Sequence, residues 1–146
     1  MSMFLVHFVT TFLITGMMWF IQLIHYPLLA DIGKESFVEY EKRHTRLAVG
    51  LVVSLMIAES ITGVGLVWRR PTGITLRQTW MGLGLLSVIW WSTFVLQVPQ
   101  HRRLASGFNA ASHRKLVSSN WIRTVCYTAR AVLVLWMLLT SAGWVS

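Results

Sequence analysis

The motifs Gln97-Val-Pro-Gln-His-Arg-Arg103 and Asn120-Trp-Ile-Arg-Thr124 lie where one apolar run ends and the next begins. Between Gln97 and Thr124 the chain places two of its five histidines and five of its thirteen basic residues. In a chain that is otherwise rich in apolar side chains, histidine and basic residues are therefore concentrated at this boundary. We predict that any functional site lies at this end of the molecule.

The composition is that of an integral membrane protein. Of the 146 residues, 55% are hydrophobic and only 12% are charged, whereas soluble domains have about 25% charged residues. The mean hydropathy is +0.59. The net charge of +8 does not indicate nucleic-acid binding, because the basic residues occupy short loops beside apolar runs, where Lys and Arg contact lipid headgroups and set orientation. We therefore expect membrane lipids, and no nucleic acid, as partners.

Four apolar runs are each long enough to cross a hydrocarbon core of about 30 Å at about 1.5 Å per residue. They extend from Met3 to Leu29, from Leu47 to Trp68, from Thr79 to Val98 and from Trp121 to Val145. Because their connections are short, the sequence predicts an all-α fold in which residues 1–146 form a single domain, an antiparallel bundle of four transmembrane helices. Both termini then lie on one membrane face, which we name face A; the opposite face is face B.

Short amphipathic helices are expected in the two loops on face B. In residues 31–46, for example, Phe37, Tyr40 and His44 recur at helical spacing, and Leu47 continues the pattern, which places His44 on an apolar stripe. Basic residues are also concentrated on this face. Face A carries Arg69, Arg70 and Arg77, whereas face B carries Lys34, Lys42, Arg43, Arg46, Arg102, Arg103, Arg114, Lys115 and Arg123. The positive-inside rule therefore predicts a cytoplasmic face B and non-cytoplasmic termini.

Three histidines, His25, His44 and His101, fall at the face-B ends of three different runs. Imidazoles that meet in a bundle can hold Fe, Cu or Zn with an open coordination position. The residues that could surround such a metal, or bind a ligand, are Gln22, Tyr26, Tyr40, Gln97 and Asn120. The alternative is that each histidine is an interfacial residue hydrogen-bonded to a carbonyl, since no closely spaced ligand pair such as H-E-x-x-H is present.

Two charged residues fall deep inside apolar runs. Glu59 lies roughly 18 Å along the second run and Arg130 roughly 14 Å along the fourth, at 1.5 Å per residue. A lone charge near the middle of the hydrocarbon layer is costly, so we predict an intramembrane ion pair between them. The alternatives are that Glu59 faces the cavity as a proton relay or metal ligand, or is protonated, and that Arg130 reaches the headgroups alone.

The motif Val98-Pro-Gln-His-Arg-Arg-Leu104, followed by Asn120-Trp-Ile-Arg-Thr124, resembles the paired signature of the anthrone oxygenase family of small four-span membrane proteins. That family has Val-Pro-x-Asn before the last loop and Asn-x-x-Arg-Thr at the entry to the last helix. His101 stands where the family has Asn. The resemblance implies oxidation of a lipophilic aromatic substrate, with Asn120 and Arg123 at the matching positions.

The residues themselves suggest a role for the same two side chains. If a helix begins near Trp121, its first turn offers free N–H groups, and Arg123 adds a fixed cation one turn inside. Together with Asn120 they would suit an oxyanion, an enolate or a carbonyl oxygen at the same cavity. The alternative is that Arg123 extends to the lipid headgroups.

Two functions therefore stay open. The first is a membrane oxidoreductase or oxygenase with a small-molecule or metal site on face B, acting on a lipophilic small molecule. The second is a non-enzymatic accessory or assembly subunit of a larger membrane complex, whose aromatic residues contact lipid and partner subunits. A discrete protein, alone or as a homo-oligomer, with a bound small molecule would support the first function, whereas recovery with other subunits would support the second.

Overall fold

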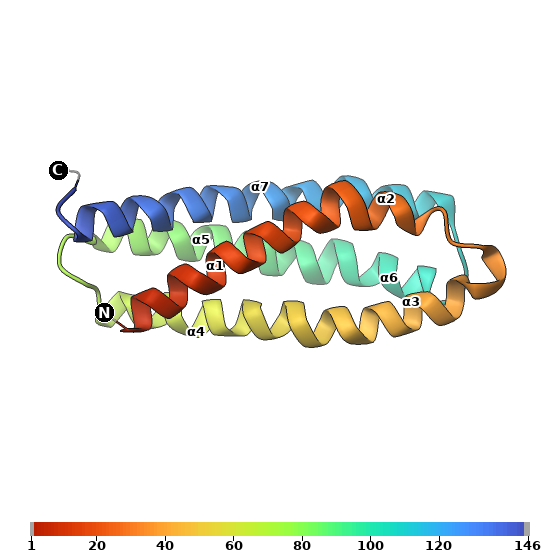
Figure 1. Cartoon of the computed structure of the whole chain (residues 1–146), viewed down its shortest axis with the longest axis horizontal. Helices are drawn as coiled ribbons and strands as arrows, with labels where there is room; N and C mark the ends of the chain where they lie inside the picture. The colour runs from red at the N-terminus through yellow and green to blue at the C-terminus, as the bar shows by residue number, and fades with distance from the viewer. Residues whose placement is uncertain (1, 145–146) are drawn as a thin grey trace.

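The computed structural model describes residues 2–144, in which four long helices run side by side (Figure 1). The first consists of α1 (Ser2–Phe20), η1 (Ile21–His25) and α2 (Tyr26–Leu29), and the second of α3 (Lys34–Ala48), η2 (Val49–Val53) and α4 (Ser54–Trp68). The third consists of α5 (Leu76–Ser92), η3 (Thr93–Gln97) and α6 (Val98–Leu104), and the fourth is α7 (Ala110–Ser141). The η segments are π-helical turns. All four long helices are long and apolar enough to cross a membrane.

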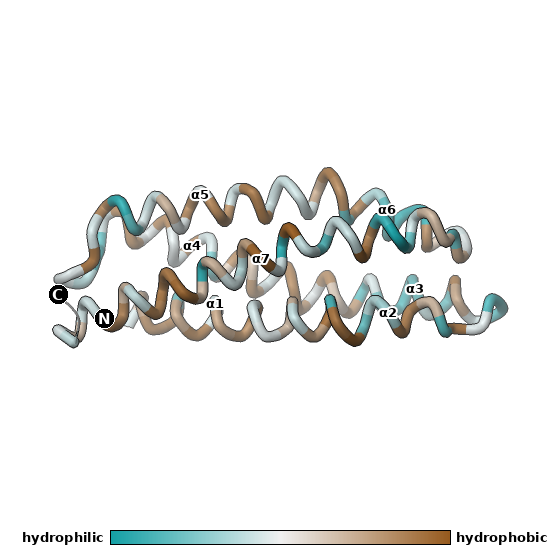
Figure 2. Tube along the Cα trace, turned by 90° about the horizontal axis from the view of Figure 1, so that it is seen from above, coloured by the Kyte–Doolittle hydropathy of each residue, from teal (hydrophilic) through white to brown (hydrophobic). Residues whose placement is uncertain are grey.

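Each long helix is antiparallel to its two neighbours. Helix α1 packs against α4 and α7, and α5 packs against the same two helices from the other side. The two ends of the described chain lie together at one end of the bundle, and loops 30–33 and 105–109 lie at the other (Figure 1). Residues 2–144 contain no strand, so the predicted all-α antiparallel bundle is confirmed. Figure 2 shows hydrophilic segments near α3 and α6, at the face-B end.

The helices extend beyond the apolar runs that predict them. Helix α7 begins at Ala110 because the side chain of Asn109 caps it, accepting a hydrogen bond from the Ser112 N–H at 2.9 Å. On the second long helix, α3 runs into α4 through a π-turn, so its amphipathic segment is helical, as predicted, and collinear with the transmembrane part. Hydropathy marks the part of a helix that lies in lipid, whereas capping residues mark its end. Val145 lies outside the described residues.

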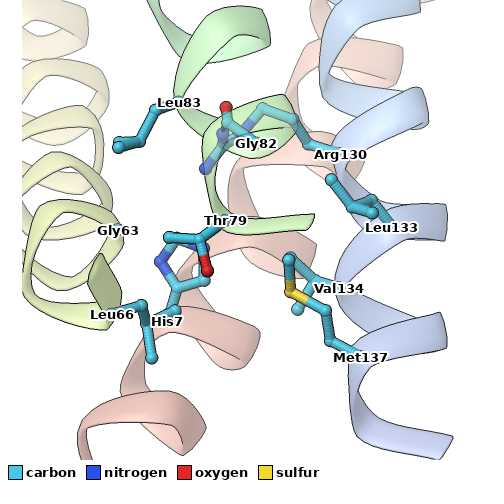
Figure 3. A pocket seen from close by; sticks show the side chains of 10 residues that line it. All are labelled: His7, Gly63, Leu66, Thr79, Gly82, Leu83, Arg130, Leu133, Val134 and Met137. Atoms are coloured by element: carbon cyan, nitrogen blue, oxygen red, sulfur yellow. Dashed lines mark hydrogen bonds between the residues drawn. The ribbon is translucent and has the colours of Figure 1, made fainter. Parts of the chain in front are cut away.

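The ion pair expected from the depth of Glu59 and Arg130 is present in the bundle. Arg130 donates through Nε and Nη2 to Glu59 Oε1, at 3.0 and 2.9 Å, and Thr11 donates to the same oxygen at 2.8 Å. Arg130 Nη1 donates to the carbonyl oxygen of Gly82. Figure 3 shows Arg130, Gly82 and His7 around one small pocket. Both charged side chains are buried, which makes their mutual pairing the main compensation for desolvation.

Two of the three π-turns have a cause in the sequence. Pro27 follows η1 and Pro99 follows η3, each two residues after the turn ends. A proline lacks an N–H, and its ring clashes with the carbonyl four residues earlier, which here belongs to Leu23 or Val95 inside the π-turn. Widening the helix at that point relieves the clash and lets the helix continue through the proline.

We expect Gly73→Ala to destabilise the protein by about 1–3 kcal/mol, because Gly73 has φ of +87° in the 69–75 loop. A Cβ at Gly73 would also lie 2.9 Å from the carbonyl oxygen of Thr140. Gly84→Ala is the matched control, since Gly84 lies in α5 with no atom within 4 Å of the added Cβ. Thermal unfolding in one detergent measures both variants. Equal melting temperatures would contradict the close packing of this loop on α7.

Candidate functional site

A cavity of about 260 Å³ lies between the second and third long helices, in the half of the bundle toward face B. Most of its wall is apolar. The polar side chains that reach it include those of Tyr26, His44, Gln97, His101 and Arg123. This volume approaches the range of about 300–1,000 Å³ that is usual for small-molecule pockets, which also combine apolar walls with a few polar groups.

The cavity is framed by π-turns. Val49, Val52 and Val53 of η2 line one side, and residues 93, 94 and 97 of η3 line the other. Val49 and Phe94 are 52% and 61% exposed, so they border the cavity and also form part of the outer, lipid-facing surface. The mouth of the cavity therefore opens toward the hydrocarbon layer. Single π-turns within α-helices are frequent at functional sites because they re-aim side chains.

The structure brings the three predicted histidines together. The ring centroids of His25 and His44 lie 4.3 Å apart with 31° between the planes, and those of His44 and His101 lie 5.9 Å apart. The lone pairs of an imidazole lie in its ring plane, and these ring planes are tilted against one another by 31° and 36°, so the closeness of the rings does not by itself direct their nitrogens to one point. Among residues 2–144, no three His, Cys, Asp or Glu side chains are arranged to hold a metal ion. The donor geometry does not support the predicted transition-metal site.

Glu41 is the site residue that the sequence pattern did not reveal. Its carboxylate is fully buried, and Oε1 lies 2.6 Å from His101 Nδ1. Thr45 donates a hydrogen bond to the same oxygen at 3.2 Å, and Oε2 has no partner within the described residues. A buried carboxylate against one imidazole nitrogen fixes which nitrogen carries the proton. His101 Nδ1 therefore donates to Glu41, and Nε2 is left as an acceptor.

The buried face of α3 differs from the apolar stripe. Phe37 and Glu41 are fully buried, whereas Tyr40 is 40% and Leu47 is 65% exposed. The stripe that places His44 on an apolar side therefore faces inward only in part, since Phe37 is buried and His44 lines the cavity, whereas Tyr40 and Leu47 are exposed. In a membrane protein the outer surface is itself apolar, so helical periodicity of apolar residues marks the lipid side as readily as the core. Phe37 and Glu41 are four residues apart and so share one side of the helix, and this spacing was the signal in the sequence that could have placed Glu41 on the inner face.

Tyr26 and His101 form the part of this network that reaches the cavity. The Tyr26 hydroxyl lies 3.2 Å from His101 Nε2, and because that nitrogen is an acceptor the hydroxyl is the donor. Tyr26 is held in place by a second contact, in which His113 Nε2 donates to the Tyr26 carbonyl at 2.7 Å. The result is a chain from Glu41 through His101 to the Tyr26 hydroxyl, along which a proton can move to or from the cavity.

Arg123 lines the cavity as a buried cation with no carboxylate partner. It is 5% exposed, and its Nε has no hydrogen-bond partner. Among residues 2–144, Glu59 is paired with Arg130, and the Glu41 carboxylate accepts from His101 and Thr45, so neither buried carboxylate is bound to Arg123. Its burial rules out the alternative that the side chain extends to the headgroups. A buried guanidinium of this kind is suited to an anionic or carbonyl oxygen supplied by a ligand.

Asn120 holds Arg123 rather than facing the cavity itself. Its Oδ1 accepts from Arg123 Nη1 at 3.4 Å, and its Nδ2 donates to Gln22 Oε1 at 2.9 Å. Gln22 Nε2 in turn donates to the Val117 carbonyl at 3.2 Å. The prediction of free N–H groups beside Asn120 is wrong, because α7 begins at Ala110 and the N–H groups of residues 120–123 lie inside a continuous helix.

Of the remaining predicted site residues, Gln97 lines the cavity, whereas Tyr40 and His25 do not. Tyr40 is on the outer surface and stacks on His44 with centroids 6.2 Å apart, and His25 lies behind His44. Gln97 lines the cavity, accepting from Ser92 and donating to Ser119, each at 3.1 Å.

Comparisons of the chain with protein-family models, curated proteins and solved structures give no match.

Proposed function

We propose that the protein binds a lipophilic, ring-containing small molecule from the membrane and oxidises it in the cavity beside Arg123. The observation that carries this proposal is the buried, unpaired guanidinium at the inner end of an apolar cavity of about 260 Å³ that opens toward lipid. An apolar wall accepts the ring body, and one fixed cation orients an oxygen substituent. The oxidation itself is the reaction implied by the resemblance to the anthrone oxygenase family.

The side chains at the cavity suit the proton-transfer step of such an oxidation. His101, oriented by Glu41, and the Tyr26 hydroxyl can together accept a proton from an acidic ring C–H or O–H group. The negative charge that develops on the substrate oxygen is then stabilised by Arg123. For anthrone, loss of that proton gives an enolate, and reaction with one dioxygen yields anthraquinone and one water. This scheme requires no metal ligand from the chain.

The same proposal assigns face B to the cytoplasm. With Arg123 buried at the cavity, eight basic residues on this face against three on face A favour that orientation by the positive-inside rule. Because the cavity opens toward lipid near this face, the substrate enters from the adjoining leaflet. Accessibility of a cysteine introduced in the 105–109 loop to a membrane-impermeant reagent distinguishes the two orientations in intact cells.

Filling the cavity tests the proposed function directly. Ala48 lines the cavity, and Ala48→Phe should reduce anthraquinone binding and anthrone oxidation at least tenfold, because a cavity of this size cannot hold both a benzyl group and a fused-ring ligand. Val125→Phe is the matched control, since Val125 is 60% exposed on α7 and does not line the cavity. Binding is measured in detergent by equilibrium titration, and oxidation by absorbance, relative to protein-free buffer.

The same purified protein can distinguish this proposal from a metal-dependent reaction and from an accessory-subunit role. Elemental analysis of the active protein tests the transition-metal expectation independently of the oxidation assay. Failure of the unmodified protein to bind either probe, together with its recovery in fixed stoichiometry with other membrane subunits, would support the accessory-subunit alternative. Equal oxidation by the Ala48→Phe and Val125→Phe variants would show that the reaction does not take place in this cavity.

A further inference from the structure

We propose a second, separate ligand site at face B, which binds the phosphate group of an anionic phospholipid. A cavity of about 460 Å³ lies beside the 105–109 loop and is lined by Arg103, Ser106, Asn109, Ala111, Ser112 and Lys115. None of these residues lines the cavity of the proposed function. The two sites therefore share no lining residue, and the second can be tested alone.

The charges at this second cavity form no ion pair with another described residue. Arg103 from α6 and Lys115 from α7 both line it, and neither takes part in an ion pair of residues 2–144. The sequence also contains no acidic residue after Glu59, so none lies on either of the two helices that form the cavity. Two exposed cations that line one cavity without a carboxylate on these helices give it a positive potential, which favours binding of an external anion.

The start of α7 adds hydrogen-bond donors to the same cavity. Asn109 caps the Ser112 N–H, and the preceding N–H groups, those of Ala110 and Ala111, have no acceptor four residues earlier in the helix. Ser112 is 5% exposed, yet its hydroxyl makes no hydrogen bond within the described chain and the residue lines the cavity. An unpartnered hydroxyl on a largely buried residue, beside free N–H groups and two cations, matches the needs of a phosphate group.

The position of the cavity favours a lipid over a free phosphate ion. It lies where α6 ends and α7 begins, at the end of two helices long and apolar enough to span a membrane. Anionic headgroups are concentrated at this depth, and basic pockets between transmembrane helices are known to hold them. A lipid bound here would rest its phosphate in the cavity while its acyl chains stay in the leaflet.

Native mass spectrometry of the full chain with phosphatidylglycerol or phosphatidylcholine tests the proposal. We expect retention of phosphatidylglycerol, and a loss of at least about tenfold in its affinity in the double variant Arg103→Gln, Lys115→Gln. The double variant Arg69→Gln, Arg70→Gln, which removes the same charge at face A, should retain the lipid. Equal loss in both double variants would overturn the proposal, because it would show only non-specific attraction.

Two further measurements test whether the bound phosphate belongs to a lipid and whether the Ser112 hydroxyl contributes to its binding. Inorganic phosphate at millimolar concentration should not displace phosphatidylglycerol; full displacement would overturn the assignment to a lipid and leave a site for free phosphate. Ser112→Ala keeps the charge and should still weaken lipid binding several-fold, whereas Ser118→Ala, at an exposed position of α7, should not. An unchanged affinity in Ser112→Ala would contradict the proposed role of the Ser112 hydroxyl.

Discussion

Glu59→Gln will destabilise the bundle by about 3–5 kcal/mol, because it leaves the Arg130 guanidinium buried without its carboxylate. Arg130→Gln will cost less, since Glu59 can take up a proton, whereas an arginine side chain stays charged in a protein. The double variant will be more stable than Glu59→Gln alone, because it leaves no buried charge. Thermal unfolding of all four proteins in one detergent gives the comparison.

An additive result is the outcome that would contradict this pair. If the two single losses sum to the loss in the double variant, Glu59 and Arg130 do not interact, whatever their distance. The control cycle uses Glu35 and Arg77, which are both exposed and belong to no ion pair of residues 2–144. Each of these control changes should alter stability by less than about 0.5 kcal/mol.

Arg123→Lys should weaken binding of anthraquinone by about ten- to a hundredfold, although it conserves the charge. The lysine ammonium is a flexible point charge that cannot reproduce the planar guanidinium held by Asn120. A hydrogen bond to a charged donor contributes about 1.5–3 kcal/mol, which corresponds to this change in affinity. Equilibrium titration with anthraquinone in detergent measures it.

Phenanthrene separates the role of the cation from that of the apolar wall. This hydrocarbon has three fused rings and no oxygen, so its affinity should be the same in the unmodified protein and in Arg123→Lys. Arg114→Lys is the matched protein control, because Arg114 is exposed on the same helix. Equal weakening of both compounds in Arg123→Lys would indicate a damaged cavity and would argue against a directional contact with the ligand oxygen.

The long apolar runs determined the membrane class, the number of helices and their antiparallel order. Twenty or more apolar residues have one stable arrangement in lipid, because a helix satisfies every backbone hydrogen bond within itself. The depth of Glu59 and Arg130 was predictable for the same reason, since both positions follow from counting residues along a helix of fixed rise. The ends of the helices were less predictable, because the cap at Asn109 lies outside the apolar run.

The candidate site was predictable only in part. The sequence indicated His25, His44 and His101 because all three lie at the face-B ends of apolar runs, and it indicated Arg123 because that residue belongs to the Asn120–Thr124 motif. Which side chains of α3 face inward was decided by tertiary packing, which buries Glu41 and leaves Tyr40 on the surface. Lipid and core are both apolar, so periodicity alone could not choose between the two faces.

The cavity itself depends on the tertiary structure. Pro27 and Pro99 could have indicated two of the three π-turns, because each proline needs the helix to widen before it. The three π-turns lie at a similar depth in the bundle, however, only because the helices that carry them are packed at particular heights relative to one another. Sequence determined the helices and their charges, since these follow from local chemistry. Only packing between distant segments decided that Arg123 and His101 would line one cavity and that Glu41 would contact His101, because none of them interacts with another until the bundle closes.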